Sequence, residues 1–276
     1  MNTYVAFTLP HETDVKIIAG GFEIVEEWEE LFEANRGLSV LDIRIEPVLD
    51  AAIQVSDITR GAYDPTLYPL IELWGIHDNR WHIPGSGEIQ AALNNTGWQK
   101  IRKYSKGYVV PQGMGFDFGG VGKGWVVDQV VDYFISKGVE KGIVDAGGDL
   151  RVWGQKIWKV GIQNPYGNGL CAILAVKNNA VATSGDYENY FREDGVDYHH
   201  ILDPSTGRPV IGEYSSVTVI ADRCTIADGL ATGMFVEGSD RINEFEELGI
   251  RCVLVSNDSK YHSDGLSVKW LSYDKN

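Results

Sequence analysis

The sequence predicts a fold that mixes amphipathic helices with short strands. Between Val127 and Phe134, apolar residues recur at i, i+3, i+4 and i+7, the spacing of one helical face. From Ser216 to Ala221 the chain is rich in the β-branched residues that strands favour. No internal repeat, low-complexity segment or flexible linker divides the 276 residues, whose length suffices for one large domain or two small ones.

The first third of the chain is expected to begin with a strand over residues 3–9 and two helices. The first helix should end near Asn35, and the second should run over residues 47–59 with Pro47 in its first turn. The expected core face of the first helix is Ile18, Phe22, Val25 and Phe32. The expected core face of the second is Val48, Ala52, Val55 and Thr59. A short helix over 86–94 and strands over 98–104 and 108–111 follow.

The rest of the chain is expected to alternate strands with three helices. The central helix follows the glycine-rich bend that ends at Gly124 and should stop at Gly138. A helix from Thr225 should turn Ile226, Leu230 and Met234 to the core, and a last helix capped by Asp240 should reach Leu248. Further strands are expected over 142–145, 150–153, 158–163, 172–177, 216–221, 251–256 and from 261 onward.

The composition is that of an ordinary globular protein, with 43% hydrophobic and 23% charged residues. A net charge of −15 argues against nucleic acid or an anionic membrane as a partner, because a polyanion would be repelled. An anionic ligand would need local help from a helix terminus or a metal cation. Three isolated cysteines provide neither a zinc motif nor a disulfide framework, so buried thiols are expected.

Nothing in the sequence predicts a membrane-spanning segment or a targeting signal. No apolar run is long enough to cross a bilayer, and residues 1–10 lack the basic start and apolar core of a signal peptide. We therefore expect a soluble chain, and the sequence leaves its compartment open.

The run Asp117 to Gly124, Asp-Phe-Gly-Gly-Val-Gly-Lys-Gly, joins a glycine-rich bend to the central helix. Glycines let backbone amides approach a ligand, and a helix N-terminus offers unpaired N–H groups and positive potential, so phosphate is the expected ligand. Lys123 would add a full positive charge. The run is not a P-loop, which needs Ser or Thr at position 124, nor a G-x-G-x-x-G dinucleotide motif. Taken alone, it is equally compatible with a phosphate site and an ordinary helix entry.

Two turns also bring polar groups together. An Asp before Pro is held extended, so a loop should present the side chains of Tyr63 and Asp64 ahead of Pro65. The run Ala146 to Asp149 contains two glycines and is typical of a hairpin turn. Beside the Lys123 loop, the same glycines would equally let the backbone touch a ligand.

Two further patterns suggest chemistry. The adjacent His199 and His200, if on a strand, point to opposite faces, so at most one of them faces a given site. Asp228 and Thr232 are four residues apart on an expected helix and so share one face. A carboxylate and a hydroxyl stacked in this way suit a hard cation such as Mg²⁺. The alternative is a helix-start Asp and a Thr that bonds back to the preceding turn.

Six motifs together resemble the ApbE family, the FAD:protein FMN transferases, and occur in that family's order. They are Gly61–Thr66, Asp117–Gly124, Asp145–Asp149, Thr183–Tyr187, His200–Pro209 and Ala227–Thr232. The resemblance covers the chain from about Met1 to its end. It implies a single α+β domain over residues 1–276, an ApbE-like fold with mixed and antiparallel sheets and helices packed around a flavin cleft.

The resemblance also implies a reaction, in which FMN is transferred from the substrate FAD to a threonine or serine hydroxyl of a target flavoprotein, with Mg²⁺ as cofactor and AMP released. The implied Mg²⁺ ligands are Asp228, Thr232 and the backbone carbonyl of Gly120. The implied FAD contacts are Met1, Ala62, Tyr63, Asp64, Asp117, Lys123 and Ile201. The implied catalytic residues are His200, Lys123 and Asp228. His200 is the expected general base, with Asp186 or Asp228 as alternatives.

The chain departs from the family pattern at three places. Many members carry a Ser-Tyr loop over the flavin after the first long helix. In this chain the corresponding segment, residues 35–42, is short and contains no aromatic residue. Some relatives carry a second carboxylate where this chain has Ala231. Members are commonly extracytoplasmic or membrane-associated, whereas no leader precedes Met1, so a cytoplasmic location is compatible as well.

Two other functions use the same residues. In a Mg²⁺-dependent FAD pyrophosphatase, water replaces the protein hydroxyl and the products are FMN and AMP. A non-catalytic FAD-binding protein would need no base, so the set Asp228, Thr232 and His200 argues against it.

Overall fold

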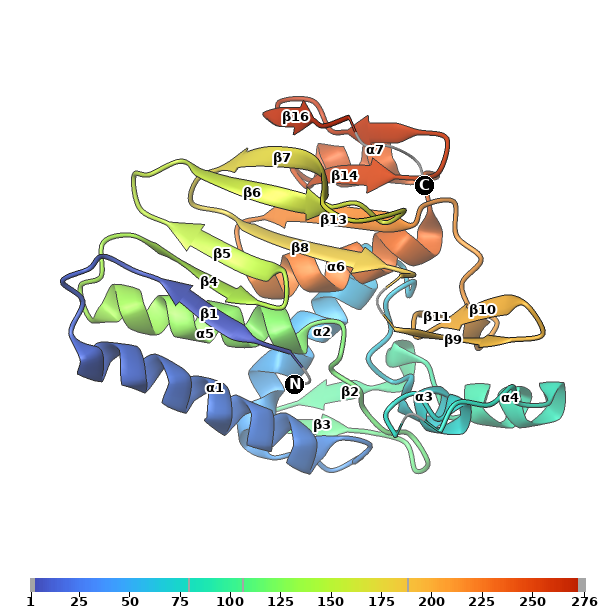
Figure 1. Ribbon diagram of the computed structural model, residues 1–276. Coiled ribbons are helices and arrows are strands. Elements are labelled where there is room, and N and C mark those ends of the chain that lie inside the picture. The colour runs from blue at the N-terminus through green and yellow to red at the C-terminus, as the bar shows by residue number, and fades with distance from the viewer. Residues whose placement is uncertain (1–2, 79, 106, 188, 273–276) are drawn as a thin grey trace.

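The computed structural model describes residues 3–272 except 79, 106 and 188. Its centre is a seven-stranded antiparallel sheet in the order β1-β4-β5-β8-β13-β14-β15 (Figure 1). Its strands are β1 (Val5–Thr8), β4 (Gly142–Ala146), β5 (Asp149–Trp153), β8 (Ala180–Gly185), β13 (Ser216–Ala221), β14 (Arg251–Val255) and β15 (Lys260–His262). The α+β class expected from the sequence is confirmed.

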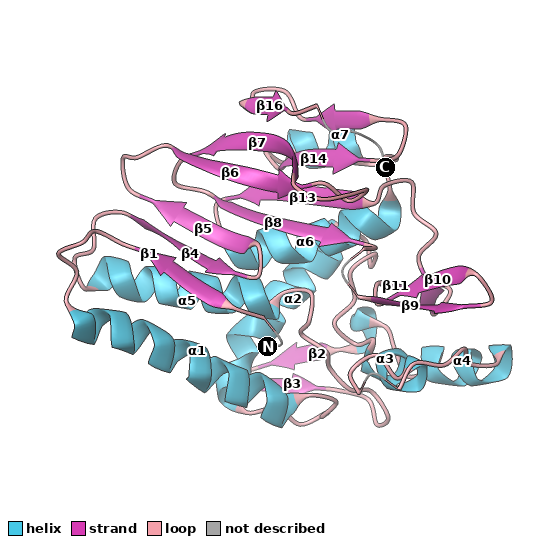
Figure 2. Cartoon of the chain, viewed as in Figure 1, coloured by secondary structure: helices cyan, strands magenta, loops and turns pink. Residues whose placement is uncertain are grey.

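Helices cover one face of this sheet (Figure 2). The helices on this face are α1 (Val15–Asn35), α2 (Glu46–Ile58), α5 (Gly122–Ser136) and α6 (Cys224–Glu237). Helices α5 and α6 pack directly on the strands, while α1 packs on α5 and α2 packs on α6. The fully buried Phe134 of α5 and Leu230 of α6 belong to the main hydrophobic core between the two layers. The expected inward faces of α2 and α5 are confirmed by the burial of their apolar side chains.

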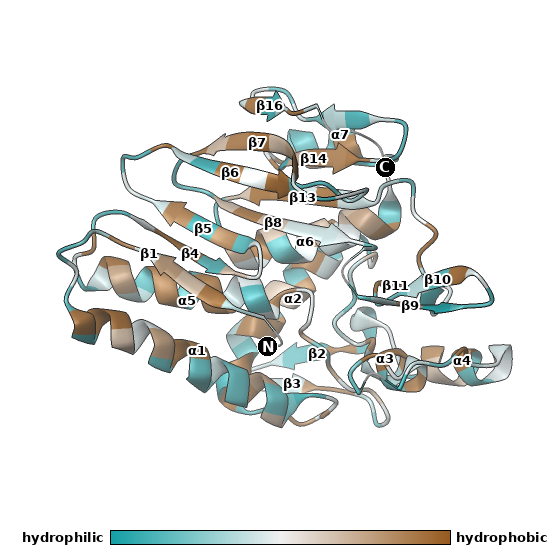
Figure 3. Cartoon of the chain, in the orientation of Figure 1, coloured by the Kyte–Doolittle hydropathy of each residue, from teal (hydrophilic) through white to brown (hydrophobic). Residues whose placement is uncertain are grey.

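A second, smaller sheet covers the opposite face. In it, β7 (Leu170–Val176) lies between β6 (Trp158–Gln163) and β16 (Val268–Trp270) and pairs with both. Figure 3 shows hydrophobic residues along β7 and β14. Side chains of the small sheet meet those of the central strands in a separate apolar core that includes Leu174 and Val253. The middle strands β5, β8, β13 and β14 of the central sheet are therefore buried on both faces.

A peripheral unit of short elements lies beside the end of β8. It contains α3 (Tyr68–Trp74), α4 (Ser86–Leu93) and the paired strands β9 (Tyr190–Glu193), β10 (Val196–His199), β11 (Leu202–Asp203) and β12 (Arg208–Pro209). A third core built on Leu70, Trp74 and Leu202 holds it together. The remaining elements are η1 (Ile43–Ile45), η2 (Trp98–Lys100), β2 (Arg102–Tyr104), β3 (Gly107–Val109) and α7 (Ile242–Glu247).

Three sequence expectations were wrong. On α1, Val25 is buried and Phe32 packs against the core as expected, but Gly21 rather than Phe22 meets the ring of Phe134, and Phe22 has 42% of its surface exposed. The segment Trp98–Lys100 is a 3₁₀ turn rather than the start of a strand. Helix α7 begins at Ile242 and has no side-chain cap, so Asp240 is not its N-cap.

Within the described residues, no helix combines the length and the apolar composition that a membrane crossing requires. The extent of one domain over residues 1–276 stays a prediction.

The first turns of α5 and α6 approach each other more closely than a side chain would allow. A Cβ atom on Gly124 would lie 2.3 Å from the carbonyl oxygen of Cys224. The amide of Gly124 also donates a 3.0 Å hydrogen bond to Oδ2 of Asp228. Because the obstacle is backbone rather than a flexible side chain, only glycine fits at position 124 without moving a helix.

We expect Gly124→Ala to lower the free energy of unfolding by about 2 kcal/mol, since overpacking outweighs the helix propensity gained. Chemical denaturation would measure this loss. Gly122→Ala on the same turn is the control, because its Cβ would meet the Phe32 ring at 3.5 Å, an ordinary contact. Equal stability of the two variants would contradict the close approach.

Candidate functional site

A cleft of about 490 Å³ lies between the peripheral unit and the main body of the fold. Its walls come from the end of α1, the loops at 62–64 and 117–120, the starts of α5 and β11, the end of β8, and α6. Its lining includes the predicted site residues Ala62, Tyr63, Asp64, Asp117, Gly120, Lys123, His200, Ile201, Asp228 and Thr232. Met1, the remaining predicted contact, lies outside the described residues.

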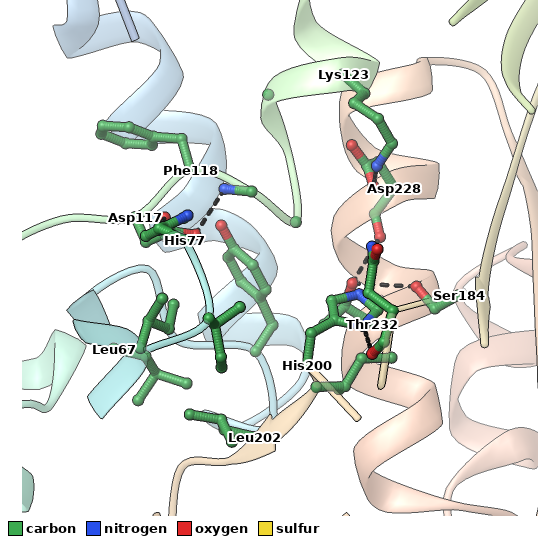
Figure 4. A pocket seen from close by; sticks show the side chains of 18 of the residues that line it. Leu67, His77, Asp117, Phe118, Lys123, Ser184, His200, Leu202, Asp228 and Thr232 are labelled. Carbon is green, nitrogen blue, oxygen red and sulfur yellow. Dashed lines mark hydrogen bonds and ion pairs between the residues drawn. The ribbon is translucent and has the colours of Figure 1, made fainter. Parts of the chain in front are cut away.

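Lys123, Asp228 and Thr232 converge at one end of the cleft (Figure 4). Lys123 lies in the first turn of α5 and extends toward α6, where its Nζ is 3.4 Å from Oδ1 of Asp228. Thr232 follows Asp228 by one helical turn, and its hydroxyl is 3.1 Å from that of Ser184 at the end of β8. Three elements of the fold therefore place polar groups at the same end of the cleft.

The carboxyl group of Asp228 is buried and lies near a second acid, Asp149. Burial, reinforced by the charge of Asp149, raises the pKa of Asp228, while Lys123 and the Gly124 amide oppose this rise. A cation bound beside Asp228 would favour its charged form.

The position of α6 depends on a buried carboxylate that no local sequence pattern reveals. Asp128 on α5 accepts hydrogen bonds from the amides of Cys224 and Thr225 at the start of α6. It also pairs with Arg151 and Arg223. A carboxylate at a helix N-terminus satisfies unpaired amides and complements the helix dipole. Asp128 therefore fixes the helix that carries the predicted metal ligands.

A histidine and a carboxylate pair at the other end of the cleft. Nε2 of His77 is 2.7 Å from Oδ2 of Asp117, and Oδ1 of Asp117 accepts from the Gly119 amide. Burial acts to raise the pKa of Asp117, but the hydrogen bonds from His77 and Gly119 outweigh it, so the pKa is lower than usual. Asp117 is thus a carboxylate that can accept hydrogen bonds from a ligand.

Tyr63 carries a hydroxyl that is buried and, among the described residues, without a hydrogen-bond partner. Its ring packs against Gly120, on which a Cβ would lie 2.8 Å from it. Burial and the nearby charges of Asp117 and Asp228 raise the pKa of Tyr63, so the hydroxyl stays protonated. Because buried polar groups are normally satisfied, this hydroxyl at the cleft wall suggests a ligand as its partner.

Asp64 is bonded mainly within its own loop. Its Oδ1 accepts from the amide and the hydroxyl of Thr66, and its Oδ2 accepts from the amide of Trp98. These bonds hold the loop in the shape that turns Tyr63 toward the cleft.

The two adjacent histidines have different surroundings. His199 is buried, accepts from the Ile201 amide at Nδ1 and donates from Nε2 to the Val210 carbonyl, so both ring nitrogens are satisfied. His200 lines the cleft, and its Nδ1 lies 3.2 Å from the Asn189 carbonyl oxygen. Because a carbonyl only accepts, Nδ1 carries the proton and Nε2 of the neutral ring keeps a free lone pair.

Sequence reasoning missed several lining residues. Arg36, His77 and Trp81 lie in loops without a recognisable motif, and only the fold brings them to the cleft. Ser184 belongs to the Thr183–Tyr187 motif, but its residue type alone predicts no role for it. Asp186, an alternative base, is absent from the lining and accepts a hydrogen bond from Ser215.

The donors at the Lys123 end are mostly oxygens. Asp228 supplies a carboxylate and Thr232 a hydroxyl, and a Cβ on Gly120 would lie 3.2 Å from that hydroxyl, so the Gly120 backbone is close. Within the described part of the chain, no three Asp, Glu, His or Cys side chains form a metal cluster. Such a set suits a cation that takes one or two carboxylates and completes its shell with water and phosphate.

The chain is thus an α+β protein with an antiparallel sheet and a cleft at the N-terminus of α5. A model of the ApbE family matches residues 3–254. The chain belongs to the ApbE family.

Relatives with known names support this assignment. The FAD:protein FMN transferase of Vibrio cholerae is 36% identical over 224 residues, which cover 76% of this chain and 67% of that protein. The FAD:protein FMN transferase of Treponema pallidum is 30% identical over 256 residues, which cover 80% of this chain and 71% of that protein.

Solved structures share the fold. The ApbE protein from Thermotoga maritima superposes with a TM-score of 0.83 at 31% identity and covers 95% of this chain and 97% of its own. The flavin transferase ApbE from Vibrio cholerae gives a TM-score of 0.83 at 30% identity, with 96% and 94% covered.

Proposed function

We propose that this protein transfers FMN from FAD to a threonine or serine hydroxyl of a target protein in a Mg²⁺-dependent reaction that releases AMP. The observation that carries the proposal is the convergence of Lys123, Asp228 and Thr232 at one end of a cleft. Support also comes from the names of the relatives, which are FAD:protein FMN transferases.

The residues at this end fit Mg²⁺. We infer that Asp228, Thr232 and the carbonyl of Gly120 hold it, because all three offer oxygen and Asp228 is a buried carboxylate with a raised pKa. When bound there, Mg²⁺ would neutralise charge on the pyrophosphate and on the departing phosphate.

The chain's own residues would bind and orient the FAD. The N-terminus of α5 and the ammonium of Lys123 attract the pyrophosphate. Ala62, Tyr63, Asp64 and Ile201 provide walls of the cleft, and Asp117 accepts hydrogen bonds from the ligand. Such positioning is the main source of rate in phosphoryl transfer.

In the reaction, the acceptor hydroxyl oxygen forms a bond to the flavin-side phosphorus, and the bond from that phosphorus to the bridging oxygen breaks. AMP leaves with the bridging oxygen. Nε2 of His200 takes the hydroxyl proton, since Nδ1 is committed to the Asn189 carbonyl. His200, Lys123 and Asp228 are thus the proposed catalytic residues.

Mass spectrometry would test this function. The protein is mixed with FAD, Mg²⁺ and a candidate acceptor domain, and an acceptor-free sample is assayed for AMP. We expect an FMN-sized adduct on a threonine or serine of the acceptor. Free FMN and AMP without an adduct would indicate a pyrophosphatase, and intact FAD with several acceptors would indicate a binding protein.

The matched variants for this assay are Asp228→Asn and Asp222→Asn. Each removes one negative charge near the start of α6, but Asp222 is exposed and lies outside the cleft lining. We expect the adduct to be lost with Asp228→Asn and kept with Asp222→Asn. Unimpaired transfer by Asp228→Asn would exclude the metal assignment.

The pH dependence should reflect the surroundings of His200. Burial, which disfavours the charged ring, lowers the pKa of His200 to about 4. Only the neutral ring accepts a proton, so a lowered pKa extends activity toward acid. At saturating Mg²⁺, we expect the single-turnover rate to change little between about pH 7.5 and 5.5. A loss with a midpoint near the ordinary histidine pKa of about 6.5 would contradict His200 as the base.

Tyr63→Phe should separate ligand binding from stability. Removing an unpartnered buried hydroxyl should leave the free energy of unfolding unchanged or raise it by about 1 kcal/mol. Losing its hydrogen bond to FAD should weaken FAD binding by about tenfold. Calorimetric titration and thermal unfolding would measure both, with Tyr198→Phe, outside the cleft lining, as control. A destabilised variant with normal FAD affinity would refute the ligand role.

A further inference from the structure

Asp149 is a buried acid next to the cleft that the proposed reaction leaves without a role. It begins β5, directly after the turn at Gly147 and Gly148, and is 2% exposed. Its Oδ1 accepts a 3.2 Å hydrogen bond from the Thr183 amide. Its Oδ2 lies 2.8 Å from Nζ of Lys123. The side chain therefore reaches from the central sheet to the catalytic lysine.

The turn before Asp149 fixes its position independently of any ligand. Ala146 pairs with Asp149, and the two glycines between them have φ values of +63° and +96°, as a tight two-residue hairpin requires. A Cβ on Gly147 would lie 2.2 Å from the hydroxyl of Thr3, so the turn is also packed from outside. Asp149 is thus held by rigid backbone before a ligand arrives.

Lys123 lies between two buried carboxylates but closer to one of them. Nζ is 2.8 Å from Asp149 and 3.4 Å from Asp228. Among the described residues, Oδ2 of Asp149 has no hydrogen-bond partner, so the ammonium is the charge that compensates it. A buried carboxylate without such a counter-charge is strongly unfavourable, so Asp149 holds the ammonium firmly.

This arrangement affects the charge available to a cation at Asp228. Two carboxylates and one ammonium leave one net negative charge at this end of the cleft. Without the Asp149 charge, the Lys123 ammonium would pair with Asp228 alone. A cation that entered the site would then have to displace this ammonium from the Asp228 carboxylate before it could bind there.

We propose that Asp149 is a positioning residue for Lys123, drawing its ammonium away from Asp228 and so keeping Asp228 free to bind the cation. The inference rests on the proposed cation site at Asp228, Thr232 and Gly120. Asp149 does not line the cleft, so it acts through Lys123 rather than on the substrate.

Asp149→Asn tests the inference, because asparagine has the same shape and can still accept from the Thr183 amide. The probe is Mn²⁺ alone, titrated into metal-free protein without FAD and followed by electron paramagnetic resonance. We expect the dissociation constant for Mn²⁺ to rise by about 10- to 100-fold, as for other residues that support a metal ligand. The kcat at saturating Mg²⁺ should change much less than the Mg²⁺ concentration needed for half-maximal rate.

Asp145→Asn is the matched control. Asp145 belongs to the same hairpin, but its oxygens accept from the Gly148 amide and from the Tyr4 hydroxyl. The substitution removes the same charge and keeps the same side-chain shape. We expect Mn²⁺ affinity to stay within about threefold of the parent protein. An equal loss of Mn²⁺ affinity in both variants would mean that only the net charge matters, and it would overturn the proposal.

A double variant tests whether Lys123 transmits the effect. In a Lys123→Met background no ammonium competes for Asp228, so Asp149→Asn should then change Mn²⁺ affinity by much less than it does alone. If Asp149→Asn lowered Mn²⁺ affinity equally in both backgrounds, the proposal would be overturned. It would also be overturned if the Asp149→Asn single variant bound Mn²⁺ as tightly as the parent protein or failed to fold. A parent protein that binds no Mn²⁺ would instead refute the proposed cation site itself.

Discussion

The close packing of the first turns of α5 and α6 is the constraint on which the rest of the structure depends. Gly124 lets the two backbones meet, and its amide bonds to Asp228 across the contact. On the opposite side, Asp128 satisfies the first amides of α6. Because these contacts fix both helices, the backbones at Lys123 and Asp228 are held close together, and the two side chains meet at the cleft.

The same contact explains how a protein with a net charge of −15 can offer a site to an anionic ligand. The positive groups at the cleft are the N-terminus of α5 and the side chains of Lys123 and Arg36, and a cation at Asp228 would offset the net negative charge that Asp149 and Asp228 leave around Lys123. Several buried acids beside it would repel a phosphate if they were not compensated. Asp128 is paired with arginines and Asp149 with Lys123, which leaves Asp228 as the carboxylate best placed to take a cation.

Much of the fold could be predicted because apolar periodicity and turn residues are local signals. The faces of α2 and α5 and the stop at Gly138 followed from such patterns. The exposure of Phe22 on α1 did not, because the neighbouring Gly21 carries no hydrophobic signal and yet is where the ring of Phe134 packs. The pairing of His77 with Asp117 joins loops forty residues apart, and no local pattern encodes it.

The aspartates around the cleft show why residue type alone could not assign roles. Both Asp64 and Asp117 line the cleft, but Asp64 accepts from Thr66 and from the Trp98 amide, whereas Asp117 accepts from His77 and from the Gly119 amide. Asp149 pairs with Lys123, whose ammonium must leave Asp228 before that carboxylate can bind a cation. Each carboxylate has the same intrinsic chemistry, so its function is decided by which partners already occupy its oxygens. Those partners come from distant segments, and the packing of α5 against α6 brings them together.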